Sequence, residues 1–274
     1  MNIRTDFADE ININRSDEYV KTTKKFKQCK VTNIEILKDK NMFNKERGTY
    51  VSIDFIDLLD ENNRKKVSNV LVKTLHDLYK INKDDKILIV GLGNSKIIAD
   101  SLGVNVADKI IVTNHLFKLY PYNIDDNLKK VCVFTPKVMG QTGLESADLV
   151  SCVCKLFKPS LTIIIDALAT SSISRINKVI QISNTGIAPG SGVGNYRKEL
   201  NSRNLKCNVI SIGVATVVEA KNIINELNSK IKIPNDDNYN LILTPKEIDE
   251  DIEHLSTVIA TSINKYIQED FSSM

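Results

Sequence analysis

The sequence predicts an α/β protein of three layers, in which a mostly parallel sheet is covered by helices on both faces. Between residue 50 and about residue 227, short apolar, β-branched runs alternate with segments of helical period, which is the pattern of parallel strands joined by helices. The run Leu161–Ile165 is apolar on both faces, as in a central strand. We therefore expect residues 7–274 to form a single α/β domain, with its core at about 50–227 and a C-terminal helix at about 245–268.

The elements follow one another through short connections. The charged, Asn-rich first ~50 residues predict a loosely held arm with one edge strand around Val31–Leu37. Apolar runs predict strands at Tyr50–Asp54, Lys86–Val90, Lys109–Val112, Val131–Thr135, Leu161–Ile165, Val179–Ile182 and Val209–Ile212. Helical periods predict helices at Asn62–Tyr79, Ile97–Val106, Gly143–Phe157 and Val217–Leu227. Thr244 is expected to cap the last helix, with Pro245 at its first position.

Composition and charge exclude several classes of function. The 37 Lys and Arg residues against 34 Asp and Glu give a formal net charge of +3, too small for the basic surface that binds nucleic acid. No apolar stretch approaches the ~20 residues that span a bilayer, and the N-terminus lacks the apolar region of a secretory signal. We expect an intracellular protein that binds neither nucleic acid nor a membrane.

Cysteine and histidine patterns give no metal site. Five cysteines, most of them in apolar runs, predict reduced thiols rather than a disulfide framework. Cys152 and Cys154 lie in a helical segment with their side chains on divergent faces, and the three histidines form no His-Glu-x-x-His motif. We therefore expect no structural zinc site.

Familiar glycine and serine motifs are incomplete. The run Gly91-Leu-Gly-Asn-Ser-Lys96 follows a predicted strand but lacks the third glycine of a dinucleotide-binding loop. No Gly-Lys-[Ser/Thr] follows the glycine-rich run Gly190–Gly194, so it is not a phosphate-binding loop. The chain contains no Gly-x-Ser-x-Gly nucleophile elbow, which argues against a serine hydrolase.

Two carboxylates remain as candidate functional groups. Asp166 ends the apolar run Leu161–Ile165, and the carboxyl edge of a parallel sheet is where α/β proteins bind their ligands. Asp100 follows the glycine run after another predicted strand. A helix cap or turn explains either residue equally well.

Six motifs in fixed order resemble the spore germination protease family. They are Gly91-Leu-Gly-Asn94, Asp100-Ser-Leu-Gly103, Thr113-Asn-His-Leu116, Val138-Met-Gly-Gln-Thr-Gly143, Ile165-Asp-Ala-Leu-Ala169 and Pro189-Gly-Ser-Gly-Val-Gly-Asn195. The resemblance runs from about Thr5 to Val218 and resumes at Thr244–Glu247. It implies a phosphorylase/hydrolase-like fold similar to that of the hydrogenase maturation proteases.

The resemblance also implies a function. The family comprises cofactor-free endopeptidases of the forespore and spore core that degrade small acid-soluble spore proteins at germination. They are made as zymogens and are typically homotetramers. The two aspartates believed to be catalytic in the family match Asp100 and Asp166.

A carboxyl pair suits such a reaction. If Asp100 and Asp166 share a site, their like charges raise the pKa of one of them, so that one group can donate a proton while the other accepts one. Backbone N–H groups of the loops Gly140–Gly143 and Gly190–Gly194 are candidate oxyanion donors, although a tight turn explains these glycines equally well. The candidate supporting residues are Asn94, His115, Gly140, Gln141 and Ser191.

The N-terminus carries a substrate-like segment. Thr5-Asp-Phe-Ala-Asp-Glu10 resembles the Thr-Glu-Phe-Ala-Ser-Glu sites that the family cleaves. We therefore expect residues 1–6 to be a propeptide that is removed by cleavage between Asp6 and Phe7, although a disordered tail is the simpler interpretation.

Departures from the family pattern leave alternatives open. The usual Arg is Asn114, the usual Pro is Val104, the usual Asp is Glu219, and a long insertion is shortened to Asn228–Leu243. One alternative is therefore a catalytically impaired paralogue. Another is a maturation protease in which Asp100, Asp166 and His115 bind nickel or a similar ion, and a third is a nucleotide-binding protein that uses Gly91–Asn94.

Overall fold

A single sheet organises the molecule. The computed structural model describes residues 5–11, 17–26, 28–120, 122, 124–190, 197–227 and 241–268. Within them, nine strands form one sheet in the order β1-β2-β3-β7-β8-β6-β4-β5, with β9 paired to β8. The strands are β1 (Tyr19–Lys25), β2 (Cys29–Ile36), β3 (Gly48–Phe55), β4 (Lys86–Gly91), β5 (Lys130–Phe134), β6 (Leu161–Thr170), β7 (Val179–Ser183), β8 (Asn208–Glu219) and β9 (Ile242–Leu243).

The sheet has a parallel half and an antiparallel half. Strands β5, β4, β6 and β8 are parallel, as the alternation of strands and helices predicts. On the other side of β8, the neighbouring strands β7, β3, β2 and β1 pair antiparallel, beginning with the pair of β8 and β7. Short connections, such as that from β1 to β2, can join only antiparallel neighbours. The α/β class is confirmed, and the sheet as a whole is mixed.

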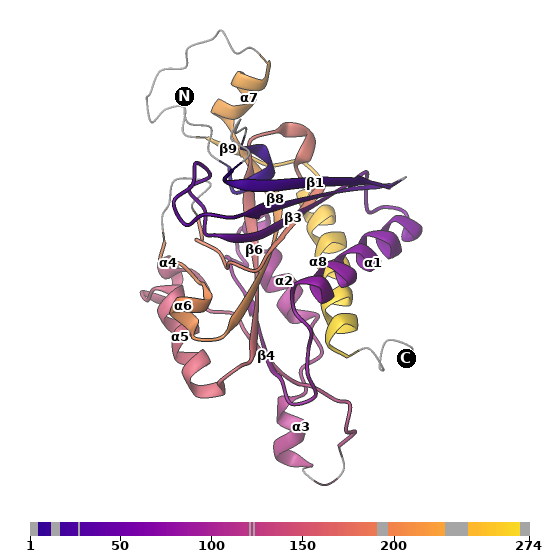
Figure 1. Ribbon diagram of the computed structural model, residues 1–274, viewed down its shortest axis with the longest axis vertical. Helices are drawn as coiled ribbons and strands as arrows, with labels where there is room; N and C mark the ends of the chain where they lie inside the picture. The colour runs from indigo at the N-terminus through magenta and orange to yellow at the C-terminus, as the bar shows by residue number, and fades with distance from the viewer. Residues whose placement is uncertain are drawn as a thin grey trace.

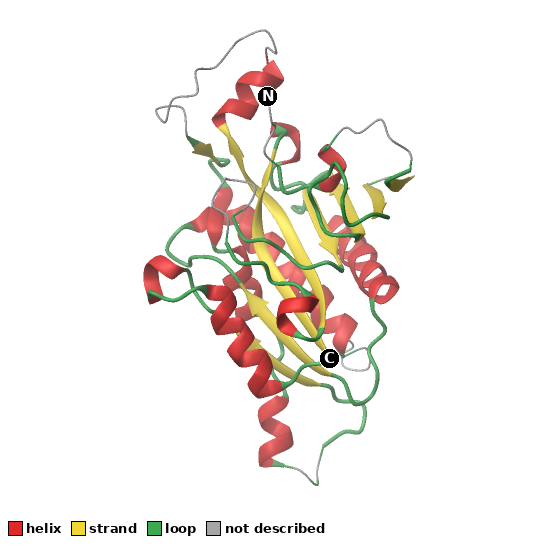
Figure 2. Ribbon diagram, turned by 60° about the vertical axis from the view of Figure 1, so that its left-hand side comes forward, coloured by secondary structure: helices red, strands yellow, loops and turns green. Residues whose placement is uncertain are grey.

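Helices cover both faces of this sheet (Figure 2). One face carries α1, α2 and α8, and α5 and α6 lie on the other (Figure 1). The helical segments are η1 (Ala8–Glu10), α1 (Glu61–Leu78), η2 (Ile98–Asp100), α2 (Leu102–Asp108), α3 (Asn114–Leu119), α4 (Met139–Thr142), α5 (Ser146–Phe157), η3 (Ile173–Arg175), α6 (Ser202–Leu205), α7 (Ala220–Leu227) and α8 (Ile248–Ile267).

Alternation along the strands divides the core in two. In β6, Ile163 and Ile165 join the large cluster that faces α1 and α8, whereas Ile164 joins the cluster under α5. Successive side chains of a strand point to opposite faces, so Asp166 and Leu168 share the face of Ile164. This face carries the candidate site.

The N-terminal region differs from its prediction. The edge strand expected around Val31–Leu37 is present as β2, but a further strand, β1, lies outside it. In place of a loosely held arm, Phe7 and Ala8 have 0% and 1% of their surface exposed. The sequence pattern did not predict this burial, because the ring of Phe7 packs with Leu168, Val179 and Ala215, more than 160 positions away in the sequence.

Three further boundaries correct the predictions. Lys109–Val112 is a loop rather than a strand: Lys109 ends α2, and the N–H of Ile111 donates to the side chain of Asn264 on α8. The segment from Val217 continues β8 as far as Glu219 before α7 begins. The last helix begins at Ile248, with Glu247 rather than Thr244 at its N-cap, and the Thr244 hydroxyl donates instead to the carbonyl of Thr216.

The described helices are all too short or too polar to cross a membrane.

Candidate active site

Asp166 lies within β6, five residues from its first residue, and does not end it. The strand continues to Thr170 because β8 extends alongside it, whereas β4 ends at Gly91 beside Ile165. The carboxyl group therefore lies where the neighbouring strand stops, with only 5% of the residue exposed. No helix follows directly, so Asp166 is not a helix cap.

A polar row crosses the sheet from this residue. Asp166 is level with Gly213 of β8, Gly213 with Gln181 of β7, and Gln181 with Ser52 of β3. In-register neighbours project to the same face, so the three side chains share one surface. Gly213 is required here because a Cβ atom would lie 2.3 Å from the side chain of Leu168.

Asp100 reaches the same edge through the turn after β4. The N–H of Leu92 donates to the carbonyl of Ile165, and that of Asn94 donates to the carbonyl of Asp100. Gly93 has a φ of +108°, and a Cβ atom there would lie 1.9 Å from the Asp100 carbonyl oxygen. This close approach within the chain accounts for the glycine of the motif without any nucleotide.

Burial perturbs both carboxyl groups, and like charge also perturbs Asp166. Burial raises the pKa of Asp166 well above its ordinary value, and the charges of Asp100 and Asp6 raise it further. Burial raises the pKa of Asp100 to about 6, while the backbone N–H of Asn94 opposes this shift. Burial and the neighbouring charges therefore favour the protonated form of Asp166, whereas Asp100, with a pKa of about 6, is largely ionised at neutral pH, and such a pair suits the donation and acceptance of protons.

The segment Thr5–Glu10 crosses this surface. Asp6 forms two hydrogen bonds with Ala169, one from its own N–H to the Ala169 carbonyl (3.0 Å) and one from the Ala169 N–H to its carboxylate (2.9 Å). Further along, the N–H of Ala8 donates to Oε1 of Gln181, and Ser52 donates to Asp9. The segment therefore runs from β6 across β7 to β3, along the polar row.

The bond between Asp6 and Phe7 lies in a distinctive environment. The carbonyl oxygen of Asp6 accepts hydrogen bonds from Nζ of Lys45 (2.8 Å) and Nε2 of Gln181 (3.0 Å). Burial lowers the pKa of Lys45, and the charges of Asp6 and Glu10 oppose that shift. Two donors on one carbonyl oxygen polarise it and would stabilise negative charge developing there.

Phe7 fills an apolar pocket beside this carbonyl. Its fully buried ring packs with Leu168, Val179 and Ala215. The guanidinium of Arg175 lies over the ring, 5.0 Å from its centroid, at a distance typical of a cation–π contact.

The other predicted site residues divide into two groups. Asn94 and Gln141 meet through a side-chain hydrogen bond of 2.7 Å, which places α4 and its exposed Gly140 beside the turn that carries Asp100. His115 lies elsewhere, exposed on α3, which packs near the amino end of β5, since the N–H of Thr113 donates to the carbonyl of Val131. Ser191 lies outside the described residues.

The position of His115 follows from the missing strand. If residues 109–112 formed a parallel strand, the next residues would emerge at the carboxyl edge near Asp166. As a loop, they leave α3 at the end of the molecule far from β1 (Figure 1). The metal set of Asp100, Asp166 and His115 is therefore not assembled among the described residues, and Asn114, at the position of the usual family Arg, begins the same helix as His115.

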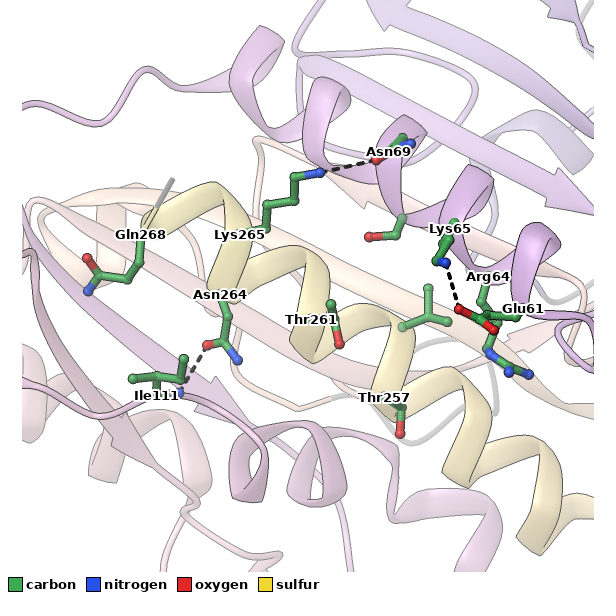
Figure 3. Close-up of a pocket in the computed structure, with 12 residues that line it drawn as sticks. Glu61, Arg64, Lys65, Asn69, Ile111, Thr257, Thr261, Asn264, Lys265 and Gln268 are labelled. Carbon is green, nitrogen blue, oxygen red and sulfur yellow. Dashed lines mark hydrogen bonds and ion pairs between the residues drawn. The ribbon is translucent and has the colours of Figure 1, made fainter. Parts of the chain in front are cut away.

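Cavities on the two faces differ in character. A cavity of about 260 Å³ is lined by Asp6, Lys45, Gln181 and Gly213 among others, and so adjoins the polar row. A larger one of about 640 Å³ lies between α1 and α8 on the opposite face of the sheet, with Lys65 paired to Glu61 and Lys265 to Asn69 (Figure 3). It contains none of the predicted site residues.

Sequence reasoning missed several residues that line the site: Lys45, Ala169, Thr170, Ser171, Arg175 and Gln181. Some had a signal. Gln181 interrupts the apolar run Val179–Ile182, and a polar Thr-Ser-Ser run follows Ala169. Lys45 and Arg175 had none, because charged residues in loops are common.

A sequence model of the family described as "Germination protease" matches residues 2–232. The chain belongs to the germination protease family. The chain is 36% identical to the germination protease of Clostridium tetani over 98% of this chain and 96% of that protein. It is 35% identical to the protein of Clostridium acetobutylicum, over 90% and 87% of the two chains.

Membership of the germination protease family makes the chain a member of a peptidase family and confirms the resemblance found in the motifs. A further relative, the germination protease of Oceanobacillus iheyensis, is 41% identical over 73% of this chain and 56% of that protein. Among solved structures, a [NiFe] hydrogenase maturation protease from Thermococcus kodakarensis aligns with a TM-score of 0.38 and 20% identity, covering 69% of this chain and 98% of that one.

Proposed function

We propose that this chain is a cofactor-free endopeptidase that degrades small acid-soluble spore proteins at germination, with Asp100 and Asp166 as its catalytic acid–base pair. Membership of the germination protease family supports the reaction class. The observation that carries the proposal is the pair of buried carboxyl groups with raised pKa values, Asp100 and Asp166, on the surface that also holds a polarised peptide carbonyl. Such an enzyme acts in the forespore and the spore core.

We infer the roles of the two groups from their surroundings. Asp100, with a pKa of about 6, is ionised at neutral pH and accepts a proton from the attacking water. The resulting hydroxide adds to the peptide carbonyl carbon. Asp166 then donates its proton to the departing amine nitrogen as the C–N bond breaks. Lys45 and Gln181 stabilise the negative charge that develops on the carbonyl oxygen.

The chain is further proposed to be a self-processing zymogen that is cut between Asp6 and Phe7. Three contacts support this: two donors hold the carbonyl of that bond, and the ring after it fills a closed pocket. The Asp6 carboxyl group also lies close enough to Asp166 to raise its pKa. A tethered substrate has a high effective concentration, so the uncut segment blocks the site even if its affinity is weak.

The assembly is proposed to be a homotetramer, as the family resemblance implies. The metal-dependent alternative loses its support because His115 lies apart from the two aspartates. The alternative of an impaired paralogue rested on Asn114, in place of the usual Arg, and on the shortened insertion. Asn114 begins α3, away from the carboxyl pair.

The test is to incubate the purified chain with a peptide containing Thr-Glu-Phe-Ala-Ser-Glu and to identify the products by mass spectrometry. We expect cleavage between Glu and Phe, unaffected by a chelator, and none with Asp166→Asn. Absence of cleavage by the processed wild-type chain would refute the proposal, and loss of cleavage on adding a chelator would favour a metal-dependent enzyme.

A further inference from the structure

The carboxylate of Glu10 lies in a site with several hydrogen-bond donors. It accepts hydrogen bonds from the backbone N–H of Ser171 (2.8 Å), from the Ser171 hydroxyl (2.7 Å) and from Nη1 of Arg175 (2.9 Å). The hydroxyls of Thr170 and Thr5 also donate to it. Only 6% of the Glu10 side chain is exposed. Apart from Thr5, every donor belongs to the end of β6 or the loop and 3-10 helix that follow it.

Arg175 also binds the preceding acidic residue. Its Nη1 and Nη2 donate to the two carboxylate oxygens of Asp9 at 3.1 and 2.9 Å, in the bidentate geometry that guanidinium groups form with carboxylates. Its Nε donates to Asp54 of β3, which also pairs with Lys30. The sheet therefore holds the guanidinium in place independently of the segment that it binds.

The surface that binds residues 5–10, called the groove below, fixes the spacing between its two ends. The Asp6 carboxyl group adjoins Asp166 at one end, and the Glu10 carboxylate fills the Ser171 site at the other. A peptide that presents its scissile bond where Asp6–Phe7 lies would place the fourth residue after that bond at Thr170, Ser171 and Arg175. The polar donors there belong to the folded sheet, so they remain when residues 5–10 leave.

We propose that Thr170, Ser171 and Arg175 form a specificity site for a glutamate at the fourth position after the scissile bond of a substrate protein, and that Glu10 occupies this site before processing. This inference rests on the proposed function. A carboxylate gains charge-assisted hydrogen bonds at the site. A neutral amide of the same shape leaves some donors unpaired, and sites built around buried polar groups discriminate strongly against such analogues.

Two carboxylates compete for this site. Glu10 and a substrate glutamate cannot occupy it together, so the segment that follows the cut must leave the groove before a second chain can bind. The acid at the third position after the bond contributes less to specificity, because Asp9 has fewer partners, Arg175 and Ser52.

The experiment compares two peptides that differ in one residue. One contains Thr-Glu-Phe-Ala-Ser-Glu and the other Thr-Glu-Phe-Ala-Ser-Gln. The full-length chain is allowed to process itself, and kcat/KM is then measured with each peptide for the wild-type chain, for Ser171→Ala and for Ser174→Ala. Ser171→Ala removes one hydroxyl donor and keeps the backbone N–H. Ser174, three residues along, is exposed and contacts only Ser172 through its hydroxyl among the hydrogen bonds of the described residues, and so provides the matched control.

We expect the wild-type chain to prefer the glutamate peptide by roughly 10–100-fold. Ser171→Ala should reduce this ratio about tenfold, and Ser174→Ala should keep it. A ratio taken on one enzyme preparation does not depend on the fraction that is folded. Cleavage of both peptides at equal rates, or an unchanged ratio in Ser171→Ala, would overturn the specificity site while leaving the proposed function intact. Absence of cleavage of either peptide by the wild-type chain would instead remove the proposed function and this inference with it.

Discussion

Nε2 of Gln181 donates a hydrogen bond of 3.0 Å to the carbonyl oxygen of Asp6, and Oε1 of the same amide accepts the N–H of Ala8. One side chain thus binds the backbone on both sides of the bond between Asp6 and Phe7. With Lys45 on the same carbonyl oxygen, this arrangement fixes the position of the bond relative to the sheet, and it leads to the first prediction.

Replacement of Lys45 by Met should slow cleavage between Asp6 and Phe7 by about 10²-fold, because one of the two donors to the carbonyl oxygen is lost. The measurement is a time course of the intact mass and the N-terminal sequence. Lys38→Met is the control, since Lys38 is half-exposed and pairs with Asp17 outside the site. Equal rates in Lys45→Met and the wild-type chain would show that Lys45 does not act on this carbonyl.

Asp100→Asn and Asp166→Asn should each abolish cleavage, both of the chain itself and of a peptide, because each removes a proton-transfer group. Circular dichroism and thermal melting should show a retained fold. Asp108→Asn is the matched control, an exposed carboxylate on the adjacent α2. Rates close to those of the wild-type chain in a folded Asp100→Asn or Asp166→Asn variant would refute the acid–base pair.

The rate should depend on pH in a bell-shaped manner. On the acid side, kcat/KM should rise through about pH 6 as Asp100 loses its proton and becomes the base. On the alkaline side it should fall as Asp166, whose pKa is raised by burial and by Asp100 and Asp6, loses the proton that it must donate. Peptide cleavage from pH 4 to 10 provides the measurement, and a rate that declines steadily from pH 4 would contradict the assignment of Asp100 as the base.

Asp166→Asn should make the protein more stable than the wild-type chain at neutral pH. Burial raises the pKa of Asp166 in the folded chain, so the folded chain holds a proton that the unfolded chain has released. The free energy of unfolding of the wild-type chain therefore falls as pH rises above the unfolded pKa. Urea denaturation should show the difference at pH 8 and little difference near pH 3, where both states are protonated.

Phe7→Ala should release the N-terminal segment without unfolding the sheet. Loss of the buried ring removes roughly 3–5 kcal/mol of packing, and a segment at the end of the chain can detach alone. Hydrogen exchange at the amides of Ala8 and Ala169, which bond to Gln181 and Asp6, should accelerate at least ~100-fold. Phe157→Ala, at the end of α5, should leave these two amides unchanged.

The sequence by itself determined the central strands and the two candidate acids. The runs at β4, β6 and β7 are buried on both faces, so their apolar, β-branched composition can be recognised from the local sequence alone. Asp166 stands out in the same way, because an acid next to an apolar run is unusual, whereas Asp100 became a candidate through the family motif that contains it.

Tertiary structure decided the remainder. The run Lys109–Val112 has the composition of a strand, yet Asn264 of α8 binds its backbone, and His115 is left far from the site as a result. The charged composition of residues 5–10 predicts a loosely held arm. These residues are buried instead, because they bind Gln181 and Arg175, which lie about 170 positions away in the sequence. Contacts of that separation leave no periodicity in the chain, and only the folded sheet brings Asp6, Asp100 and Asp166 together.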